Sequence, residues 1–364
     1  MDHLRILHIT PWYPTEEQPQ KAIWIKRHID CLRPFCANEI WVLSIGRGKF
    51  ERSRTTKNGV RWMVMRHPWA FWRSIELFSF LILFIQLVFL GKARSMDVIN
   101  FHIAYPNLVY FHWLRPFLKC QIVITEHWSA YHFNFNSTKP MRRVKRMFCR
   151  GLPVITVSES LAADIENYCG TPLTRHHVPN VVDVSIFLNR GLKRSKVLLL
   201  GAWWKEPKRP FIALEALSTF LANNADWSVR IFGGGPQSSA IELWCKEHGQ
   251  SWLGLLGADA IASELAKSFG FLMPSDYETF SVAVAEALCC GCPVLCSDVG
   301  GMSELIDSSN GIKVADSSRW GAALNQFTST LWARDTISDE AQKRYSKEAI
   351  GRLYYDTLKQ IMAC

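Results

Sequence analysis

Short, almost continuous apolar runs recur along the first half of the chain and alternate with stretches of helical periodicity. The runs lie at 4–10, 39–45, 60–65, 97–103, 121–127 and 153–158. Strands that are apolar throughout are typical of parallel sheets with helices on both faces. The pattern therefore predicts a doubly wound α/β domain in this half.

A second series of the same kind follows, with runs at 196–202, 227–235, 269–275, 293–297 and 311–315. The polar stretch 189–196 separates the two series, so we expect two Rossmann-like domains, at 1–188 and 189–344. Residues 345–364 form a last segment, whose part 345–363 is periodic at helical spacing. Its predicted apolar stripe consists of Ile350, Leu353, Tyr354, Leu358 and Ile361.

The most apolar segment, 75–90, predicts a further helix. It has 16 residues, whereas a membrane-spanning helix needs about 20. Its polar residues Glu76, Ser79 and Gln86 fall near one face at helical spacing. This pattern favours a packed or interfacial helix over a transmembrane span.

The charge is distributed unevenly between the halves. The whole chain carries +10, while residues 1–185 hold 24 Lys and Arg against 13 Asp and Glu, a net of +11. The basic half predicts an anionic partner: a membrane surface, a phosphate-bearing substrate or nucleic acid.

The cysteines and the N-terminus bear on the compartment. No apolar leader follows a basic start in "MDHLRILHIT", and eleven cysteines are scattered along 364 residues. We therefore expect a cytoplasmic protein with its cysteines as small core residues. Cys289, Cys290, Cys292 and Cys296 lack the paired C-x-x-C spacing of a zinc site.

The segment 275–294, "SDYETFSVAVAEALCCGCPV", carries the clearest candidate chemistry. A helix is predicted to begin at 280–282, after a strand, and to end at Gly291. The N–H groups at a helix start bind phosphate, and flanking carboxylates suit hydroxyl groups. Glu278 before the helix and Glu286 within it thus predict a sugar-nucleotide site. The alternative is that Glu278 caps the helix and Glu286 is a solvated surface residue.

The segment 271–314 resembles the donor-site signature of the retaining GT-B glycosyltransferases, of the glycosyl transferases group 1 and family 4 type. Further resemblances follow in the expected order, at 11–32, 123–132, 157–165, 178–187 and 229–236. The resemblance implies two Rossmann-like domains facing a deep cleft, with a C-terminal helix that crosses back to the first domain.

Matched residue by residue, the resemblance implies three catalytic residues: His127 near the reacting sugar, Lys208 at the leaving diphosphate and Glu278 against the donor sugar. It implies that Glu286 binds the ribose. The other expected donor-binding residues are Thr279, Phe280, Ser281, Val282 and Gly234. A preset cation at the leaving diphosphate lowers the barrier to its departure.

The chain departs from the family pattern at three positions. Ala202 stands where arginine is common, Ala22 where glycine is usual in the first loop, and Val181 where an Asn-Gly-Val-Asp pattern has glycine. No Asp-x-Asp occurs, so we expect no metal and no cofactor, with Lys208 and a helix start supplying the positive charge instead.

The predicted function is transfer of a hexose, with retention, from a nucleotide diphosphate sugar to a hydroxyl of a glycan or lipid-linked glycan in surface polysaccharide synthesis. The basic run 141–150 favours an acceptor at an anionic membrane surface, peripheral to the inner face of the plasma membrane. Two alternatives are a sugar-nucleotide epimerase of similar architecture, for which no acid–base pair is evident, and a basic nucleic-acid-binding protein. The aromatic residues disfavour nucleic acid as a partner, because they fall mostly in apolar strands and helices.

Overall fold

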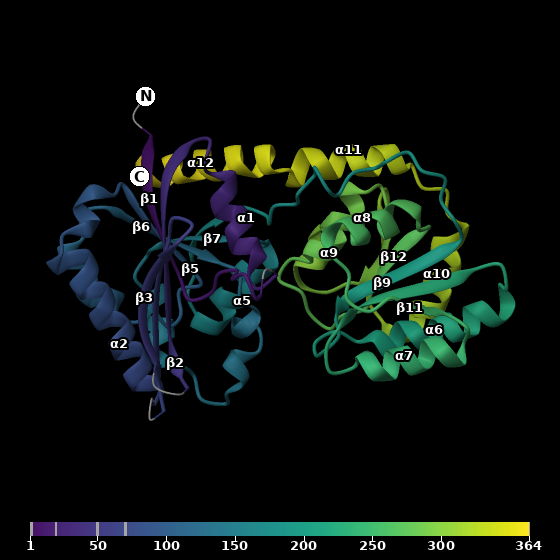
Figure 1. Ribbon diagram of the computed structural model, residues 1–364, viewed down its shortest axis with the longest axis horizontal. Coiled ribbons are helices and arrows are strands. Elements are labelled where there is room, and N and C mark those ends of the chain that lie inside the picture. The colour runs from purple at the N-terminus through teal and green to yellow at the C-terminus, as the bar shows by residue number, and fades with distance from the viewer. Residues whose placement is uncertain (1–2, 19, 49–50, 69–70, 364) are drawn as a thin grey trace. The chain divides into compact units, whose positions relative to one another are not determined.

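The computed structural model describes residues 3–18, 20–48, 51–68 and 71–363 (Figure 1). It divides into two compact units, Met1–Asn180 with Ile350–Cys364, and Val181–Ala349. The second unit therefore begins before the polar stretch at 189–196, and the first unit takes in the end of the last helix.

The first unit is built on a sheet whose strands are parallel except for the antiparallel pair β3–β4. The strands are β1 (Leu4–Thr10), β2 (Cys36–Arg47), β3 (Glu51–Lys57), β4 (Val60–His67), β5 (Val98–His102), β6 (Gln121–Glu126), β7 (Pro153–Thr156) and β8 (Thr174–His177). Among the described residues their spatial order is β3-β4-β2-β1-β5-β6-β7-β8. The order reverses between β1 and β5, and ligands of such sheets bind beyond the carboxyl ends at a reversal.

Helices and single helical turns connect these strands. The helices are α1 (Ile23–Cys31), α2 (Trp72–Phe84), α3 (Phe111–Leu114), α4 (Arg142–Phe148) and α5 (Glu159–Cys169). Single turns lie at Ile85–Phe89, Lys92–Ser95, Arg115–Phe117, Ser129–Tyr131 and Asn134–Asn136. Helix α5 shows how local sequence sets the ends: the Ser158 side chain accepts from the Leu161 N–H, and Gly170 stops the helix at φ 70°.

The second unit is a parallel sheet with helices on both faces. Its strands are β9 (Val197–Trp203), β10 (Ser228–Gly234), β11 (Ser251–Trp252), β12 (Gly270–Met273), β13 (Val294–Ser297) and β14 (Gly311–Val314). In the described chain their order is β11-β10-β9-β12-β13-β14, which reverses between β9 and β12. Its helices are α6 (Pro210–Asn223), α7 (Ser238–Glu247), α8 (Ala258–Lys267), α9 (Val282–Cys289), α10 (Trp320–Ser329) and α11 (Arg334–Tyr345), with single turns at Gly300–Glu304 and Ser317–Arg319. Figure 1 shows α6 and α7 on one side of the sheet and α8 and α9 on the other.

The eleven predicted apolar runs all form strands, which confirms the doubly wound α/β prediction for both units. The pattern missed β3, β8 and β11. Their sequences, ERSRTTK, TRHH and SW, contain no apolar run. These strands lie at sheet edges, where fewer neighbours bury their side chains.

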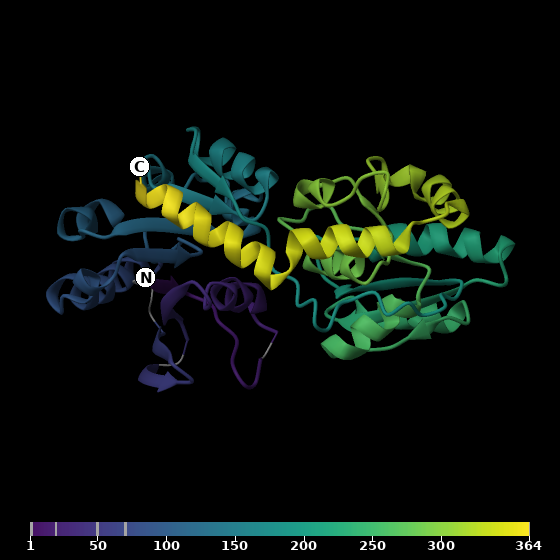
Figure 2. The same ribbon diagram turned by 90° about the horizontal axis from the view of Figure 1, so that it is seen from above.

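The predicted last helix is present as α12 (Lys347–Ala363). Its residues from Ile350 onward belong to the first unit, along which the helix lies in Figure 2. Four of the five predicted stripe residues are buried, but Leu353 is 42% exposed, so that part of the prediction was wrong. Thr357, which is buried, completes the face instead.

The helix predicted at 75–90 is present as helix α2 followed by the π-helical turn Ile85–Phe89. Its polar face is turned inward. Glu76 and Ser79 are buried, while large apolar side chains on the other face are exposed. Arg143 reaches Glu76 at 2.9 Å, and the Ser79 hydroxyl donates to Asn107 Oδ1 at 2.5 Å. Across the described residues, no helix combines the length and apolar character that a membrane crossing needs.

Tyr354 of α12 closes a buried ring of hydrogen bonds with two strand residues. Asn100 Nδ2 donates to the Tyr354 hydroxyl at 2.7 Å, and the Thr125 hydroxyl donates to Asn100 Oδ1 at 2.9 Å. The Tyr354 hydroxyl, 2.6 Å from Thr125 Oγ1, must therefore be the donor of that pair. Each group thus gives and receives one bond.

We predict that Tyr354→Phe lowers the free energy of unfolding by about 2–4 kcal/mol, because it leaves two buried polar groups each short of one partner. Chemical denaturation measures the change. Tyr355→Phe is the matched control, since Tyr355 stacks on Phe35 through its ring. Equal stability of the two variants would contradict a stabilising role for the ring of hydrogen bonds.

Candidate functional site

The structure brings two predicted catalytic residues of the second unit together. Lys208 follows β9 and Glu278 follows β12, the strands between which the strand order reverses. The Lys208 ammonium forms an ion pair with Glu278 Oε1. The ligand site expected from the topology and the candidate site from the sequence therefore coincide.

The pair is largely withdrawn from water. The side chains of Lys208 and Glu278 are 19% and 14% exposed. Burial lowers the pKa of Lys208 to about 8. The Ser275 hydroxyl also donates to Glu278 Oε1, at 3.3 Å. Sequence reasoning did not single out Ser275, although it stands three residues before Glu278.

Backbone contacts hold the two loops in register. The Arg209 N–H donates to the Pro274 carbonyl at 3.1 Å, and the Asp276 N–H donates to the Pro207 carbonyl at 2.9 Å. At the surface, Arg209 and Asp276 pair at 2.7 Å. These contacts fix Lys208 and Glu278 relative to each other.

A third loop, after β13, supports Glu278 from behind. The Gly301 N–H donates to the Glu278 carbonyl at 2.8 Å. Gly300 has φ 51°, and a Cβ at this position would lie 2.2 Å from the same carbonyl oxygen. Only glycine therefore fits this turn.

The start of α9 lies directly after Glu278. Ser281 is the N-cap, and its side chain makes no cap hydrogen bond. The first N–H groups of the helix, from Val282 onward, have no acceptor within the helix and suit an anion. Glu278 is engaged by Lys208 and Ser275, so the alternative in which it caps α9 was wrong. Glu286 lies half-buried in the first turns of α9.

The other predicted donor-binding residues surround this helix start or end a neighbouring strand. Thr279 is half-buried, and the ring of Phe280 meets the ring of Tyr345 edge-on. Gly234 ends β10, beside β9, and its carbonyl accepts from the Trp204 N–H at 2.6 Å. A Cβ on Gly234 would lie 2.9 Å from the Trp203 ring, so packing alone also requires a small residue there.

The three departures from the family pattern occupy different environments. Ala22 precedes α1 with φ 52°, a left-handed conformation that favours glycine, so the alanine carries strain. Ala202 lies in β9, so the arginine that is common at this position is missing. The nearby cations Lys205 and Arg209 do not supply a buried charge instead, because Lys205 is exposed and the exposed Arg209 is bound to Asp276. Val181 is buried, 3% exposed.

His127, the third predicted catalytic residue, belongs to the first unit. It follows β6 directly and is 7% exposed. The buried Glu126 carboxylate orders the turn, because it accepts from the N–H groups of His127 and Trp128 at 3.1 Å and from the Tyr131 hydroxyl at 2.9 Å. Burial raises the pKa of Glu126.

Three histidines that the sequence analysis did not select lie around His127. His102 Nδ1 is 3.4 Å from His127 Nε2, and His8 Nδ1 is 3.0 Å from His102 Nε2. The His28 ring meets His127 edge-on, with centroids 4.9 Å apart. Their signal in the sequence is that His8 and His102 stand near the ends of apolar strands.

The cysteine cluster lies inside the second unit. Cys289, Cys290, Cys292 and Cys296 are all fully buried. Burial raises the pKa of each thiol. Within the described residues, no group of three or more His, Cys, Asp or Glu side chains is arranged to hold a metal ion.

Known families match both units. Residues 38–186 match Glycosyltransferase Family 4, and residues 194–330 match Glycosyl transferases group 1. An uncharacterized glycosyltransferase of Methanocaldococcus jannaschii is 26% identical over 61% of this chain and 62% of its own length. The N-acetyl-alpha-D-glucosaminyl L-malate synthase of Bacillus anthracis is 24% identical over 74% of this chain and 77% of its own.

Solved structures share the fold over nearly the whole chain. The lipopolysaccharide outer core galactosyltransferase WaaB superposes with a TM-score of 0.75 at 14% identity, covering 98% of this chain and 99% of that one. HepE of Anabaena, in complex with UDP, gives 0.72 at 15% identity, covering 98% and 100%. With two Rossmann-like sheets of parallel strands and both glycosyltransferase domains, the chain belongs to the GT-B glycosyltransferases.

Proposed function

We propose that the protein transfers a hexose, with retention, from a nucleotide diphosphate sugar to a hydroxyl of a glycan or lipid-linked glycan. The observation that carries this proposal is the Lys208–Glu278 pair beside the uncapped start of α9, at the strand reversal of the second unit. HepE, a structural neighbour, has been solved with UDP-glucose, which supports a nucleotide sugar as donor.

The proposed roles follow from charge. The diphosphate binds the N–H groups at the start of α9, and Lys208 neutralises the negative charge that builds as the nucleoside diphosphate leaves. Glu278 hydrogen-bonds hydroxyls of the sugar, and Glu286 binds the ribose. The diphosphate opposes deprotonation of Lys208, because a neighbouring anion favours the ammonium. In the first unit, His127 is proposed to contact the reacting sugar.

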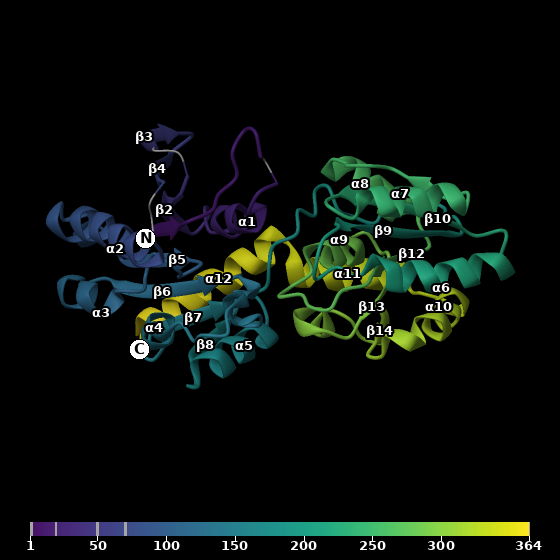
Figure 3. The same ribbon diagram turned by 90° about the horizontal axis from the view of Figure 1, so that it is seen from below.

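We further propose that the acceptor is presented at an anionic membrane surface. The outward face of α2 and the following turn is apolar: Leu77, Phe78, Leu81, Ile85 and Phe89 are 40–81% exposed. Trp113 and Phe117, also exposed, pack beside it on Phe80 and Phe84. Figure 3 shows α3 next to α2. Such a contiguous apolar face next to basic residues is typical of an interfacial helix.

Only part of the basic run 141–150 is available at this face. Within the run 141–150, Arg143 points inward to Glu76, and Lys145 lies over the Tyr168 ring. Arg146 and Arg150 are exposed. Burial lowers the pKa of His112 in α3, and the charges of Arg150 and Arg146 lower it further, so both arginines lie near the apolar face. They are therefore the better candidates for contact with anionic lipid. This arrangement supports a cytoplasmic enzyme bound peripherally to the inner face of the plasma membrane.

A panel of sugar nucleotides tests the proposed function, with nucleotide release and thermal stabilisation as readouts. A donor at ~100 times its Kd should add about 2.7 kcal/mol of stability.

Lys208→Ala should lower turnover ~100-fold, the cost of one preset charge contact at a developing anion. In the wild type, kcat/KM should fall as the pH rises through about 8, because the free enzyme then loses the Lys208 proton. Lys208→Arg, which stays charged, should remove that alkaline limb.

The two glutamates should separate kinetically. Glu278→Gln should lower turnover ~100-fold, because it acts at the reacting ring. Glu286→Gln should raise the donor KM about tenfold with turnover retained, since ribose contacts are equal in ground and transition states. Glu340→Gln, on the exposed surface of α11, is the control. Donor kinetics untouched by both changes would exclude this site.

Flotation with vesicles tests the membrane proposal. The protein should bind anionic but not neutral vesicles, and lose them at 1 M salt, where the Debye length is ~3 Å. Arg146→Glu with Arg150→Glu should weaken binding at least ~30-fold, at ~1 kcal/mol for each basic residue. Lys193→Glu with Lys246→Glu makes the same change in net charge on the second unit and should leave binding intact. No binding to anionic vesicles at low salt would favour a soluble acceptor.

A further inference from the structure

A line of polar side chains crosses four neighbouring strands of the first sheet and ends at His127. Asn38 in β2 is paired with Ile6 in β1, and His8 stands two residues after Ile6. His8 is paired with Asn100 in β5, two residues before His102. His102 is paired with Thr125 in β6, two residues before His127.

Each step therefore moves one strand sideways and two residues toward the carboxyl ends. Because residues i and i+2 of a strand point to the same face, the four side chains share one face of the sheet. Asn38, His8, His102 and His127 thus form a diagonal that runs from inside the sheet to its carboxyl edge, where ligands of such sheets bind.

Hydrogen bonds join the diagonal from end to end. His8 Nε2 lies 3.0 Å from Asn38 Oδ1, and His8 Nδ1 lies 3.0 Å from His102 Nε2. His102 Nδ1 lies 3.4 Å from His127 Nε2. The three histidines are 0–7% exposed. Burial lowers the pKa of His8 to about 4 and those of His102 and His127 well below the usual range, with the Arg33 charge lowering that of His8 further. Each ring is therefore neutral at neutral pH and carries one N–H.

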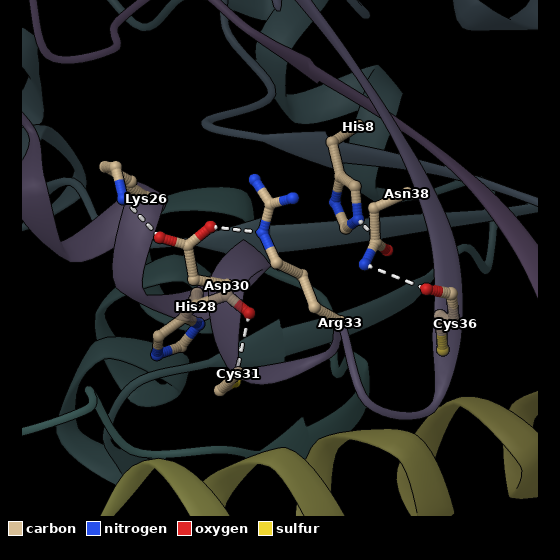
Figure 4. Close-up of polar contacts among 8 residues, drawn as sticks. All are labelled: His8, Lys26, His28, Asp30, Cys31, Arg33, Cys36 and Asn38. Atoms are coloured by element: carbon tan, nitrogen blue, oxygen red, sulfur yellow. Dashed lines mark hydrogen bonds and ion pairs between the residues drawn. The ribbon is translucent and has the colours of Figure 1, made fainter. Parts of the chain in front are cut away.

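Asn38 sets the donor-to-acceptor direction of the hydrogen bonds along the diagonal. Its Nδ2 donates to the Cys36 carbonyl at 3.3 Å, so the amide oxygen faces His8 (Figure 4). His8 must then donate from Nε2 and accept at Nδ1. By the same rule His102 donates from Nε2 to His8, and His127 donates from Nε2 to His102. His127 is left with an unprotonated Nδ1.

One neighbouring contact competes with this assignment. Asn100 Nδ2 lies 3.4 Å from His102 Nε2, and both are donors here. If His102 Nε2 accepted instead, His8 would have to donate from Nδ1, and its bare Nε2 would face Asn38 Oδ1 at 3.0 Å. The amide of Asn100 already donates to Tyr354 at 2.7 Å. The assigned direction therefore keeps the shorter contacts.

The unprotonated Nδ1 of His127, at the end of this series of hydrogen bonds, has other buried acceptor atoms as neighbours. Among the described residues, His127 Nδ1, His28 Nδ1 and Asn180 Oδ1 are buried and have no hydrogen-bond partner. His28 donates from Nε2 to the Pro179 carbonyl at 2.9 Å, which leaves its Nδ1 as an acceptor too. The His28 ring touches His127. Burial lowers the pKa of His127, and its side-chain contact with Asn180 offsets that shift only in part. Buried acceptors of this kind require a donor.

We propose that Asn38, His8 and His102 are positioning residues that hold His127 in the Nε2–H tautomer, so that its Nδ1 accepts a hydrogen bond from a hydroxyl group of the bound sugar or acceptor. The identification of the ligand as a hydroxyl group depends on the proposed glycosyl transfer. The tautomer relay itself rests only on the diagonal. Hydroxyls are the abundant donors of a sugar, and an imidazole with a protonated Nδ1 would offer them a donor in place of an acceptor.

The test changes Asn38, at the far end of the diagonal, which three successive hydrogen bonds separate from His127. Asn38→Asp keeps an acceptor at His8 Nε2 and should preserve the tautomer of His127. Asn38→Lys puts a donor there, which reverses every bond of the chain and should move the His127 proton to Nδ1. Asn38 is half-buried, and its side chain bonds His8 and the Cys36 carbonyl. Ala37→Lys adds the same amino group to the opposite face of β2 and is the matched control.

Nitrogen-15 NMR of the histidine rings, in the full chain at neutral pH, reads which nitrogen carries the proton. The His127 signals are assigned by their loss in His127→Gln, and thermal unfolding checks that each variant folds. Opposite tautomers in Asn38→Lys and Asn38→Asp, with wild-type behaviour in Ala37→Lys, support the relay. The same tautomer in both Asn38 variants overturns it.

Kinetics with the best sugar nucleotide of the panel test whether the tautomer of His127 affects turnover. Asn38→Lys should lower kcat about tenfold, the value of one hydrogen bond, while Asn38→Asp and Ala37→Lys stay near wild type. A reversed tautomer with unchanged kinetics overturns the positioning role. If the wild type turns over no sugar nucleotide, the proposed function fails, and the NMR result alone decides the relay.

Discussion

Parallel strand pairing is the constraint on which the rest of this structure depends. Parallel strands need crossover helices that cover both faces of the sheet, so their side chains must be apolar along most of their length. Polar chemistry is thereby confined to the loops that leave the strands at the carboxyl edge. Lys208, Glu278 and His127 all stand in such positions, after β9, β12 and β6. In the second unit the two loops belong to the strands where the order reverses, so the topology itself brings a lysine and a glutamate 70 residues apart into contact.

The first sheet departs from this rule in an ordered way. Asn100, Thr125, His8 and His102 are polar and fully buried within or at the ends of its central strands. A buried polar group costs stability unless it is hydrogen-bonded, and here each has partners, through Tyr354 of α12 or along the diagonal toward His127. Polar groups in the middle of a parallel sheet are explained more readily by a function at its edge than by packing, which apolar residues would serve better.

Helix α2 shows the reverse arrangement, with polar residues inside and apolar residues outside. Glu76 and Ser79 satisfy Arg143 and Asn107 in the interior, while Leu81 and Phe89 are exposed. An exposed apolar face is unfavourable in water alone, since roughly 25 cal/mol is gained for each Å² of apolar surface removed from it. The proposed membrane interface would remove that cost, and Arg146 and Arg150 would add attraction to anionic lipid.

The sequence by itself determined the strands, the two-unit α/β architecture and the helix start between Glu278 and Glu286, because these depend on periodicity and on residues close together in the chain. It missed β3, β8 and β11, whose polar sequences become strands only through edge pairing. It did not show which way α2 faces, because Glu76 is stabilised by Arg143, 67 residues away. The inward turn of Arg143, the contact of Lys208 with Glu278 and the diagonal through His8 and His102 were decided by tertiary structure alone. Each depends on strand order and register, which place residues from distant parts of the chain within hydrogen-bond distance and which no local pattern encodes.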